Sequence, residues 1–226
     1  PSTRAEARLI RVSRNETTQA AGQPIVISGV RFDGSPGHAP DFELGCVAHS
    51  DGDVVYHSVV DAILGALTLP DIGCLFPDND PRLKGADSSI FMEEAYARMV
   101  ARDYRIGNCD VTSCAGADAS TFRYDAPHTT HTQIPRRASE PTHPADRRLS
   151  QVTLICQKPK VNVETAEGLS VKQLMRDNLA RLLRTPVECL NVKARTHEKV
   201  DSVGECRALE CHVVLTLEHS SVPINE

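Results

Sequence analysis

Three polar side chains recur at intervals of four residues in an otherwise apolar segment. They are Asp53, His57 and Asp61. A helix brings residues four apart onto one face, whereas the apolar residues between them form a stripe that can face a core. That stripe consists of Val55, Val59, Ala62, Ile63 and Ala66. The spacing therefore predicts a helix from about Asp53 to Leu67, with Ser50 or Asp51 as its N-cap.

The triplet has two interpretations. A carboxylate one turn away orients an imidazole and makes it more basic, as a metal-binding histidine requires. Alternatively, the triplet is a solvated acidic face on which His57 is incidental. The spacing alone leaves both open.

Composition narrows the class of protein. The 226 residues suffice for one sizeable domain, and with 4% aromatic residues and no Trp its core must be built from Val, Leu, Ile and Ala. The net charge of −5 shows no excess of basic residues that could bind phosphates, so nucleic acid is not an expected partner. No run of 18 apolar residues exists, so no membrane span is expected either. The eight cysteines form no C-x-x-C pair, which favours buried thiols in a reducing compartment over zinc ligands or a disulfide framework.

Short apolar runs alternate with helical patterns along the chain. Expected strands are Leu9–Val12, Pro24–Ile27, a strand beginning at Val111, Val152–Cys156, Leu190–Arg195 and Leu209–Leu217. Further helices are expected from Asp87 or Ser88 through Met99, and over Gly168–Leu183. Strands separated by helices predict an α/β fold, an α+β sandwich in which helices cover one face of a mixed sheet.

Residues 115–150 differ from the rest. They hold four prolines and three histidines but almost no Val, Leu or Ile, which predicts a disordered low-complexity insertion. Asp110-Val-Thr112 before the segment is echoed by Gln151-Val-Thr153 after it, as though an insertion had split one strand. We therefore divide the chain into a divergent segment (1–23), a domain in two parts (24–114 and 151–217), the insertion, and a tail (218–226).

Five motifs lie in order in the two parts of this domain. They are Ala48-His-Ser-Asp-Gly-Asp53, Asp71-Ile-Gly73, Phe76-Pro-Asp-Asn-Asp80, Lys84-Gly-Ala-Asp-Ser88 and Asn191-Val-Lys-Ala194. In sequence and spacing they resemble the 2-C-methyl-D-erythritol 2,4-cyclodiphosphate synthase family of non-mevalonate isoprenoid biosynthesis. The resemblance implies a phosphorus–oxygen lyase that cyclises 4-diphosphocytidyl-2-C-methyl-D-erythritol 2-phosphate and releases CMP. The alternative is an impaired member that trimerises and binds cytidine nucleotide without efficient turnover.

The resemblance also implies a setting for that activity. It implies a homotrimer with sites between subunits, and a divalent metal, zinc or manganese and possibly magnesium. The expected location is the plastid stroma or another organelle lumen in a eukaryote, and the cytoplasm in a bacterium.

Site residues follow from the same resemblance. His49 and Thr196 take catalytic roles, and His57 is the metal ligand, with Asp61 as its outer partner. Substrate-binding positions are Ser50, Asp71, Ile72, Gly73, Phe76, Pro77, Asp78, Asn79, Asp80, Lys160 and Glu198. Nucleotide-binding positions are Cys156, Lys158, Pro159, Lys160, Val161, Arg195 and Thr196.

The chain departs from the family at the N-terminal metal ligands. The family's Asp-x-His pair is absent, and the expected positions, 15–19, hold Asn-Glu-Thr-Thr-Gln. Glu16 is the only ionisable oxygen donor there, although Asp33 and His38 in the following loop could substitute. Because a catalytic zinc normally has three protein ligands, the sequence predicts weak metal binding.

Overall fold

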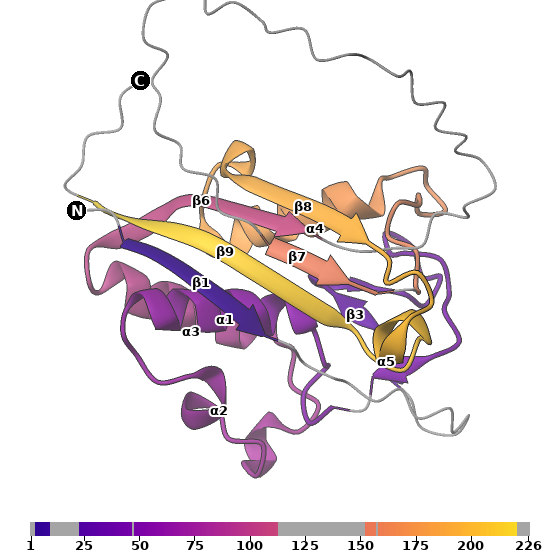
Figure 1. Cartoon of the computed structure of the whole chain (residues 1–226), viewed down its shortest axis with the longest axis horizontal. Helices are drawn as coiled ribbons and strands as arrows, with labels where there is room; N and C mark the ends of the chain where they lie inside the picture. Colours follow the sequence, from indigo (N-terminus) through magenta and orange to yellow (C-terminus); the bar gives the residue numbers. More distant parts are fainter. Residues whose placement is uncertain (1–2, 10–22, 47, 113–151, 157, 221–226) are drawn as a thin grey trace, which may run out of the picture.

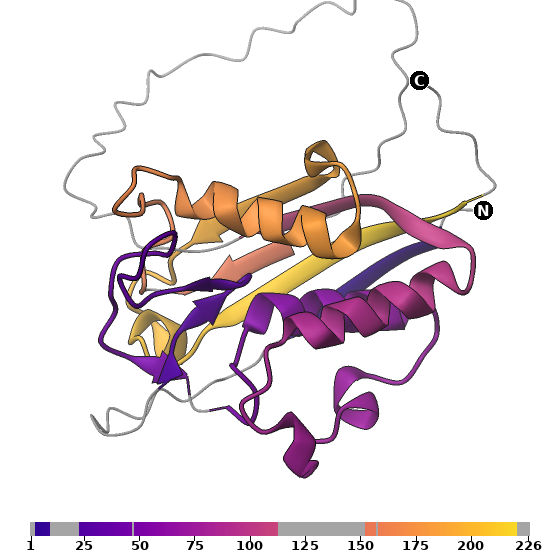
Figure 2. The ribbon, with the colours of Figure 1, turned by 180° about the vertical axis from the view of Figure 1, so that it is seen from behind.

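A five-stranded mixed sheet carries three long helices on one face (Figures 1 and 2). The computed structural model describes residues 3–9, 23–46, 48–112, 152–156 and 158–220. Strand order across the sheet is β1 (Thr3–Leu9), β9 (Glu210–His219), β6 (Tyr104–Thr112), β7 (Val152–Ile155) and β8 (Leu190–Arg195). β9 runs antiparallel to β1 and β6, whereas β8 is parallel to β6 and β7. The predicted fold class is confirmed.

The helices bury an aliphatic core against the sheet. The long ones are α1 (Val54–Ala66), α3 (Ser89–Val100) and α4 (Val171–Leu183). The short ones are α2 (Ile72–Leu75), α5 (Asp201–Gly204) and the 3-10 turns η1 (Pro81–Leu83) and η2 (Val187–Cys189). Alternate residues of β9, from Cys211 to Leu217, are fully buried beneath them, as a strand with one covered face requires. Among the described residues, no helix is long and apolar enough to span a bilayer.

Two small antiparallel two-stranded sheets complete the described fold. β2 (Gln23–Pro24) pairs with β5 (Gly45–Cys46), and β3 (Val26–Ile27) pairs with β4 (Val30–Arg31). The turn between β3 and β4 lies against α1 and contains Gly29, whose φ of +71° favours glycine.

Several predicted boundaries are wrong. The N-cap of α1 is Asp53, not Ser50 or Asp51, because Asp53 accepts from the N–H groups of Val55 and Tyr56 at 3.0 and 3.1 Å. α4 begins at Val171 rather than Gly168, which has a φ of +77° that no helix continues.

Two strand boundaries also differ. β6 begins at Tyr104 rather than Val111, because its early residues pair with β9, a partner more than a hundred residues away. β1 ends at Leu9, where the predicted strand Leu9–Val12 would begin, and residues 10–12 lie outside the described part of the chain.

β6 and β7 both contact β9 and β8, and the end of β6 pairs in parallel with the start of β7 at Thr112 and Thr153 (Figure 1). Val111 and Val152 both pair with Val213, and Thr112 and Thr153 both pair with Lys193. The two echoing motifs therefore share strand partners, and the interpretation that an insertion splits one strand stays a prediction. The insertion predicted over 115–150 lies outside the described residues, and the division into domain segments stays a prediction.

This register predicts the outcome of a deletion. Removing residues 113–153 joins Thr112 directly to Leu154 and keeps both sets of strand partners. We expect the shortened chain to fold with an equal or higher melting temperature, since each doubling of a closed loop costs roughly 0.6 kcal/mol.

The matched control removes residues 113–152 and leaves one extra residue. That residue shifts β7 by one position, which turns every following side chain of the strand to the opposite face. We expect this control to melt well below the first variant. Equal melting temperatures for the two deletions would contradict the register.

Asp53 is a fully buried carboxylate that joins α1 to the β3–β4 turn. Besides capping α1, it accepts from the Gly29 N–H at 2.7 Å. Burial, followed by repulsion from Asp51, raises the pKa of Asp53 to about 7, against the lowering effect of its N–H donors. Burial and the neighbouring Asp53 likewise raise the pKa of the Tyr56 hydroxyl.

The raised pKa predicts how stability depends on pH. Below about pH 4 Asp53 is protonated in both the folded and the unfolded chain, so its contribution to the free energy of unfolding is fully present. Between about 4 and 7 the unfolded chain releases the proton first, and the free energy of unfolding falls by on the order of 1 to 4 kcal/mol. Denaturant titrations across this range measure the slope.

Asp53→Asn should lower stability at every pH, because one amide oxygen cannot accept from all three N–H groups. It should also flatten the dependence of the free energy of unfolding on pH, because the amide does not titrate. Asp41→Asn, at an exposed site, is the matched control and should keep the parent's slope. A parental slope in Asp53→Asn would assign the pH dependence to another group.

Candidate functional site

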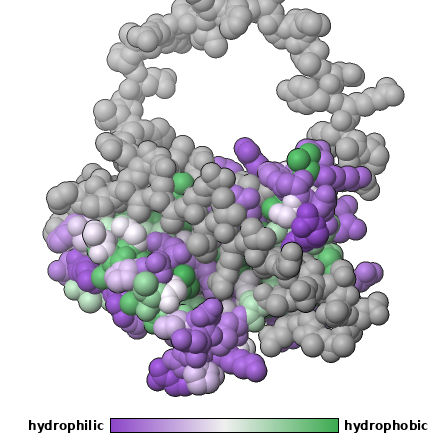
Figure 3. All heavy atoms as spheres, turned by 60° about the horizontal axis from the view of Figure 1, so that its bottom comes forward, coloured by the Kyte–Doolittle hydropathy of each residue, from purple (hydrophilic) through white to green (hydrophobic). Residues whose placement is uncertain are grey.

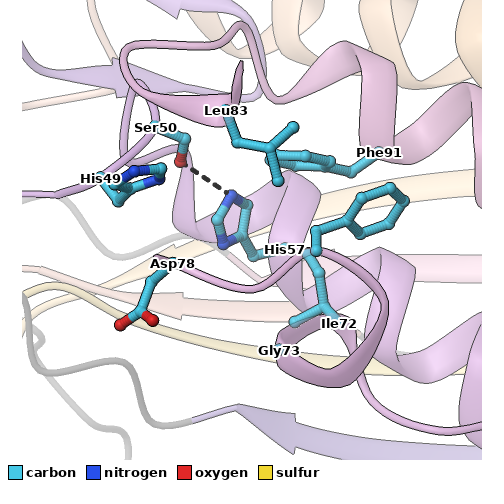
Figure 4. Close-up of a pocket in the computed structure, with 9 residues that line it drawn as sticks. His49, Ser50, His57, Ile72, Gly73, Asp78, Leu83 and Phe91 are labelled. Carbon is cyan, nitrogen blue, oxygen red and sulfur yellow. Dashed lines mark hydrogen bonds between the residues drawn. The ribbon is translucent and has the colours of Figure 1, made fainter. Parts of the chain in front are cut away.

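A pocket of about 270 Å³ opens beside the N-terminal half of α1 (Figure 4). Its lining residues are His49, Ser50, His57, Ile72, Gly73, Phe76, Asp78, Leu83 and Phe91. All but Leu83 and Phe91 were predicted as site residues. The structure therefore brings the first three predicted motifs together around one cavity.

His57 lies at the inner end of the pocket and is 4% exposed. The rings of His57 and Phe91 are nearly perpendicular with a centroid distance of 5.4 Å, and Phe76 packs on Phe91 at 4.6 Å. This apolar wall excludes water from one side of the imidazole. It also explains why Phe91, on α3, belongs to the pocket although no sequence motif marked it.

Two hydroxyls, rather than the carboxylates four residues away, lie against this ring. The Nε2 atom of His57 is 2.9 Å from Ser88 Oγ and 3.3 Å from Ser50 Oγ. Ser88 in turn donates its hydroxyl to Asp51. The interpretation that Asp53 flanks the imidazole is wrong, because its carboxylate is turned to the end of the helix and to Gly29. Asp61 accepts from the Ile72 N–H at 2.7 Å, which attaches the pocket loop to α1.

The loop from Asp71 to Asp80 uses two of its carboxylates to hold its own shape. Asp71 caps α2 by accepting from the Cys74 N–H at 2.9 Å. Asp80 caps η1 and binds the Arg82 guanidinium, whose hydrogen bonds hold the pKa of Asp80 to about 2. Asp78, by contrast, is exposed and is one of the residues that line the cavity (Figure 4).

Of the predicted loop positions, Asp71, Pro77, Asn79 and Asp80 do not line the pocket. For Asp71 and Asp80 the structure supports a role in shaping the loop.

The remaining predicted residues form a second group at one edge of the sheet. β7 and β8 are parallel, with Ile155 opposite Arg195, so the segments that follow them leave the sheet on the same side. Thr196 donates its hydroxyl to Glu198 at 2.9 Å. Cys156, Pro159 and Val161 are buried, whereas Lys158, Lys160, Arg195 and Glu198 are exposed. None of this group lines the pocket in the described chain.

The described residues do not form a complete metal site. No three His, Cys, Asp or Glu side chains among them lie close enough together to hold an ion. Asp33 is paired with Arg31 at 2.8 Å, His38 Nδ1 accepts from the Arg31 N–H at 3.1 Å, and neither lines the pocket. Residues 15–19, where the Asp-x-His pair was expected, lie outside the described part.

Comparisons with known proteins agree on one family. The model of the YgbB family matches residues 15–119 and 147–218, so the interruption falls between β6 and β7. A rice protein named "2-C-methyl-D-erythritol 2,4-cyclodiphosphate synthase, chloroplastic" is 40% identical over 196 residues, 87% of this chain and 63% of that protein. A 2-C-methyl-D-erythritol 2,4-cyclodiphosphate synthase from Proteus mirabilis is 37% identical over 199 residues, 88% of this chain and 89% of that protein.

A solved structure agrees at the level of the fold. IspF of Plasmodium falciparum, in a CDP complex, superposes with a TM-score of 0.62 at 24% identity, covering 97% of each chain. Against the plant proteins the chain is short, since it spans 59 to 63% of three of them.

Proposed function

Because this chain belongs to the YgbB family, whose relatives are named 2-C-methyl-D-erythritol 2,4-cyclodiphosphate synthases, we propose that it catalyses that cyclisation. The substrate is 4-diphosphocytidyl-2-C-methyl-D-erythritol 2-phosphate, and the second product is CMP. The observation that carries the proposal is that His49, Ser50 and His57 line one pocket together with residues of the loop from Ile72 to Asp78.

The reaction requires stabilisation of phosphoryl charge. An oxygen of the 2-phosphate attacks the β-phosphorus, a new P–O bond forms, and the P–O bond to CMP breaks. Negative charge spreads over the equatorial oxygens of the transferring group. His49 and Ser50 lie side by side at the cavity (Figure 4) and can donate hydrogen bonds to those oxygens.

The pocket loop suits the methylerythritol part of the substrate. The Asp78 carboxylate can accept from diol hydroxyls, while Ile72 and Phe76 offer apolar contact to the carbon chain. Such a combination of a few polar groups on an apolar wall is typical of small-molecule sites.

A divalent cation, when bound, would neutralise phosphoryl oxygens and so reduce the repulsion between the two phosphates. We propose that His57 supplies one ligand, with zinc, manganese and magnesium all remaining candidates. The described residues supply no complete set of ligands for such an ion.

The separation of the two residue groups supports a shared site. In our proposal the segments 156–161 and 195–198 bind the cytidine nucleotide and complete the pocket of a neighbouring copy within a homotrimer. The long helices occupy one face of the sheet (Figure 2), and the alternation of β8 and β9 places Lys193, His212 and Val214 on the other face. That face is available for self-association.

The assembly can be tested by sedimentation. We expect a mass of three chains, and Val214→Glu should reduce it toward one chain by placing a charge in the interface. Val200→Glu, at a site 64% exposed and outside the sheet, is the matched control. A mass of one chain at micromolar concentration, with activity retained, would exclude shared sites.

CMP release from the CDP-linked substrate tests the function. His49→Ala should lower kcat by about 10²-fold, the usual cost of removing one donor to transition-state charge. His38→Ala removes a histidine outside the pocket and should leave kcat unchanged. Equal effects of the two substitutions would show that the reaction does not occur in this pocket.

The same assay distinguishes an active synthase from the second candidate, which is an impaired family member that binds cytidine nucleotide without efficient turnover. This candidate rests only on the sequence expectation that positions 15–19, which hold Asn-Glu-Thr-Thr-Gln, lack the Asp-x-His pair. An impaired member would bind CDP but release CMP only in excess metal, whereas turnover at trace metal would exclude it.

A further inference from the structure

We propose that His197, Asp201 and Gly204 are positioning residues. They hold the Thr196 hydroxyl and the Glu198 carboxylate in the arrangement that receives the diphosphate of a cytidine nucleotide. This inference rests on the proposed function, because it takes the end of β8 as part of the nucleotide site. The three residues do not touch the nucleotide in this proposal, and they act through the turn that joins β8 to β9.

The turn lies at the edge of the sheet where β7 also ends. β8 ends at Arg195, opposite Ile155, and β9 begins at Glu210. Because β7 pairs with β8 on one side and with β9 on the other, the connection from 196 to 209 crosses the end of β7. Figure 1 shows α5, which is part of this connection, beyond the ends of β7 and β8. The shape of the turn therefore decides where Thr196 lies relative to the segment that follows β7.

The backbone of this turn adopts conformations that residues other than glycine rarely adopt. The angle φ is +50° at Glu198, +61° at Lys199 and +61° at Asp201. A side chain in the left-handed region costs free energy, so such residues persist only where the surrounding structure fixes them. The carboxylate of Glu198 is therefore carried on a segment whose shape other parts of the turn must specify.

Asp201 is the first residue that specifies this shape. Its carboxylate accepts from the N–H groups of Val203 and Gly204 at 2.8 and 3.3 Å, and it lies 2.7 Å from the buried Nδ1 atom of His197. Desolvation would raise the pKa of Asp201, but the two N–H donors and then His197 outweigh it and lower that pKa. The backbone closes the same loop, because the Val200 N–H donates to the His197 carbonyl at 2.8 Å. One charged side chain thus joins the start of the turn to α5.

Gly204 holds the turn from the other side by close approach. A Cβ atom at this position would lie 2.5 Å from the carbonyl carbon of Lys199 and 2.7 Å from its Cα atom, so only glycine fits. The Gly204 N–H also donates to the Val200 carbonyl at 3.1 Å. The last turn of α5 therefore packs directly on the backbone of Lys199, next to Glu198.

These contacts fix the pair of side chains that the proposed site uses. Thr196 donates its hydroxyl to Glu198 at 2.9 Å, and a charged carboxylate can only accept, so the direction of this hydrogen bond is defined. A phosphoryl oxygen bound beside Thr196 takes the place of Glu198 as the acceptor of that proton. Because the turn is already formed, the nucleotide does not have to order it, which lowers the cost of binding.

CDP binding to the full chain, measured by calorimetry, tests the proposal. Asp201→Ala and Gly204→Ala should each weaken CDP binding by roughly 10- to 100-fold, the range that misplacing a binding group by about 1 Å can produce. Asp201→Asn should retain most of the parental affinity, because the amide oxygen still accepts from the two N–H groups and Asn tolerates a positive φ. Ser202→Ala, in the same turn, is the matched control and should leave the affinity unchanged.

A second background distinguishes positioning from a contribution to folding. When Thr196→Val has removed the hydroxyl, Asp201→Ala should cost less CDP affinity than it costs in the parent, because the group that it positions is gone. Equal losses in the two backgrounds would overturn the proposal. Parental CDP affinity in Asp201→Ala and Gly204→Ala variants that fold, as judged by their melting temperatures, would overturn it as well.

The proposed function fails differently. A chain that releases no CMP, yet binds CDP with the dependence on Asp201 and Gly204 described above, would contradict the cyclase activity and leave the positioning roles intact. A chain that releases CMP and whose CDP affinity is the same in these variants would do the reverse.

Discussion

The hydrogen-bonded junction at the buried N-terminus of α1 is the constraint on which the site depends. A helix end inside a protein must find partners for its free N–H groups. Asp53 satisfies two of them and also holds Gly29, while Asp51 joins the segment before the helix to the segment before α3. His57 lies one turn beyond this junction, so its position in the pocket follows from the way the helix begins.

How far the sequence predicts this structure depends on the range of the interactions involved. The apolar stripe of α1 and the run Leu190–Arg195 specify their elements locally, and both were predicted within a residue. The N-cap was wrong because Ser50, Asp51 and Asp53 are all good caps by local rules, and a distant Gly29 decides among them. The start of β6 was missed for the same reason, since β9 defines it.

In the candidate site, too, the features that depend on local sequence were predicted and those that depend on distant contacts were not. The motifs around His49 and Ile72 led to the pocket because their spacing resembles that of a known family. The position of the Ser88 hydroxyl beside the His57 ring was not predicted, although the motif that contains Ser88 was recognised, because the sequence indicated only a helix cap. Its contact with His57 joins residues 31 positions apart and has no periodic signature. Leu83 and Phe91 carry no chemical signal at all and are identified only by packing.

A crystal structure of the chain with CDP bound would test the central claim, that one pocket receives the diphosphate while a second copy receives the cytidine. The account predicts the β-phosphate beside His49 and Ser50, with the cytosine against the segment 156–161 of a neighbouring copy. CDP bound by a single chain away from the α1 junction, with the pocket still open, would contradict it.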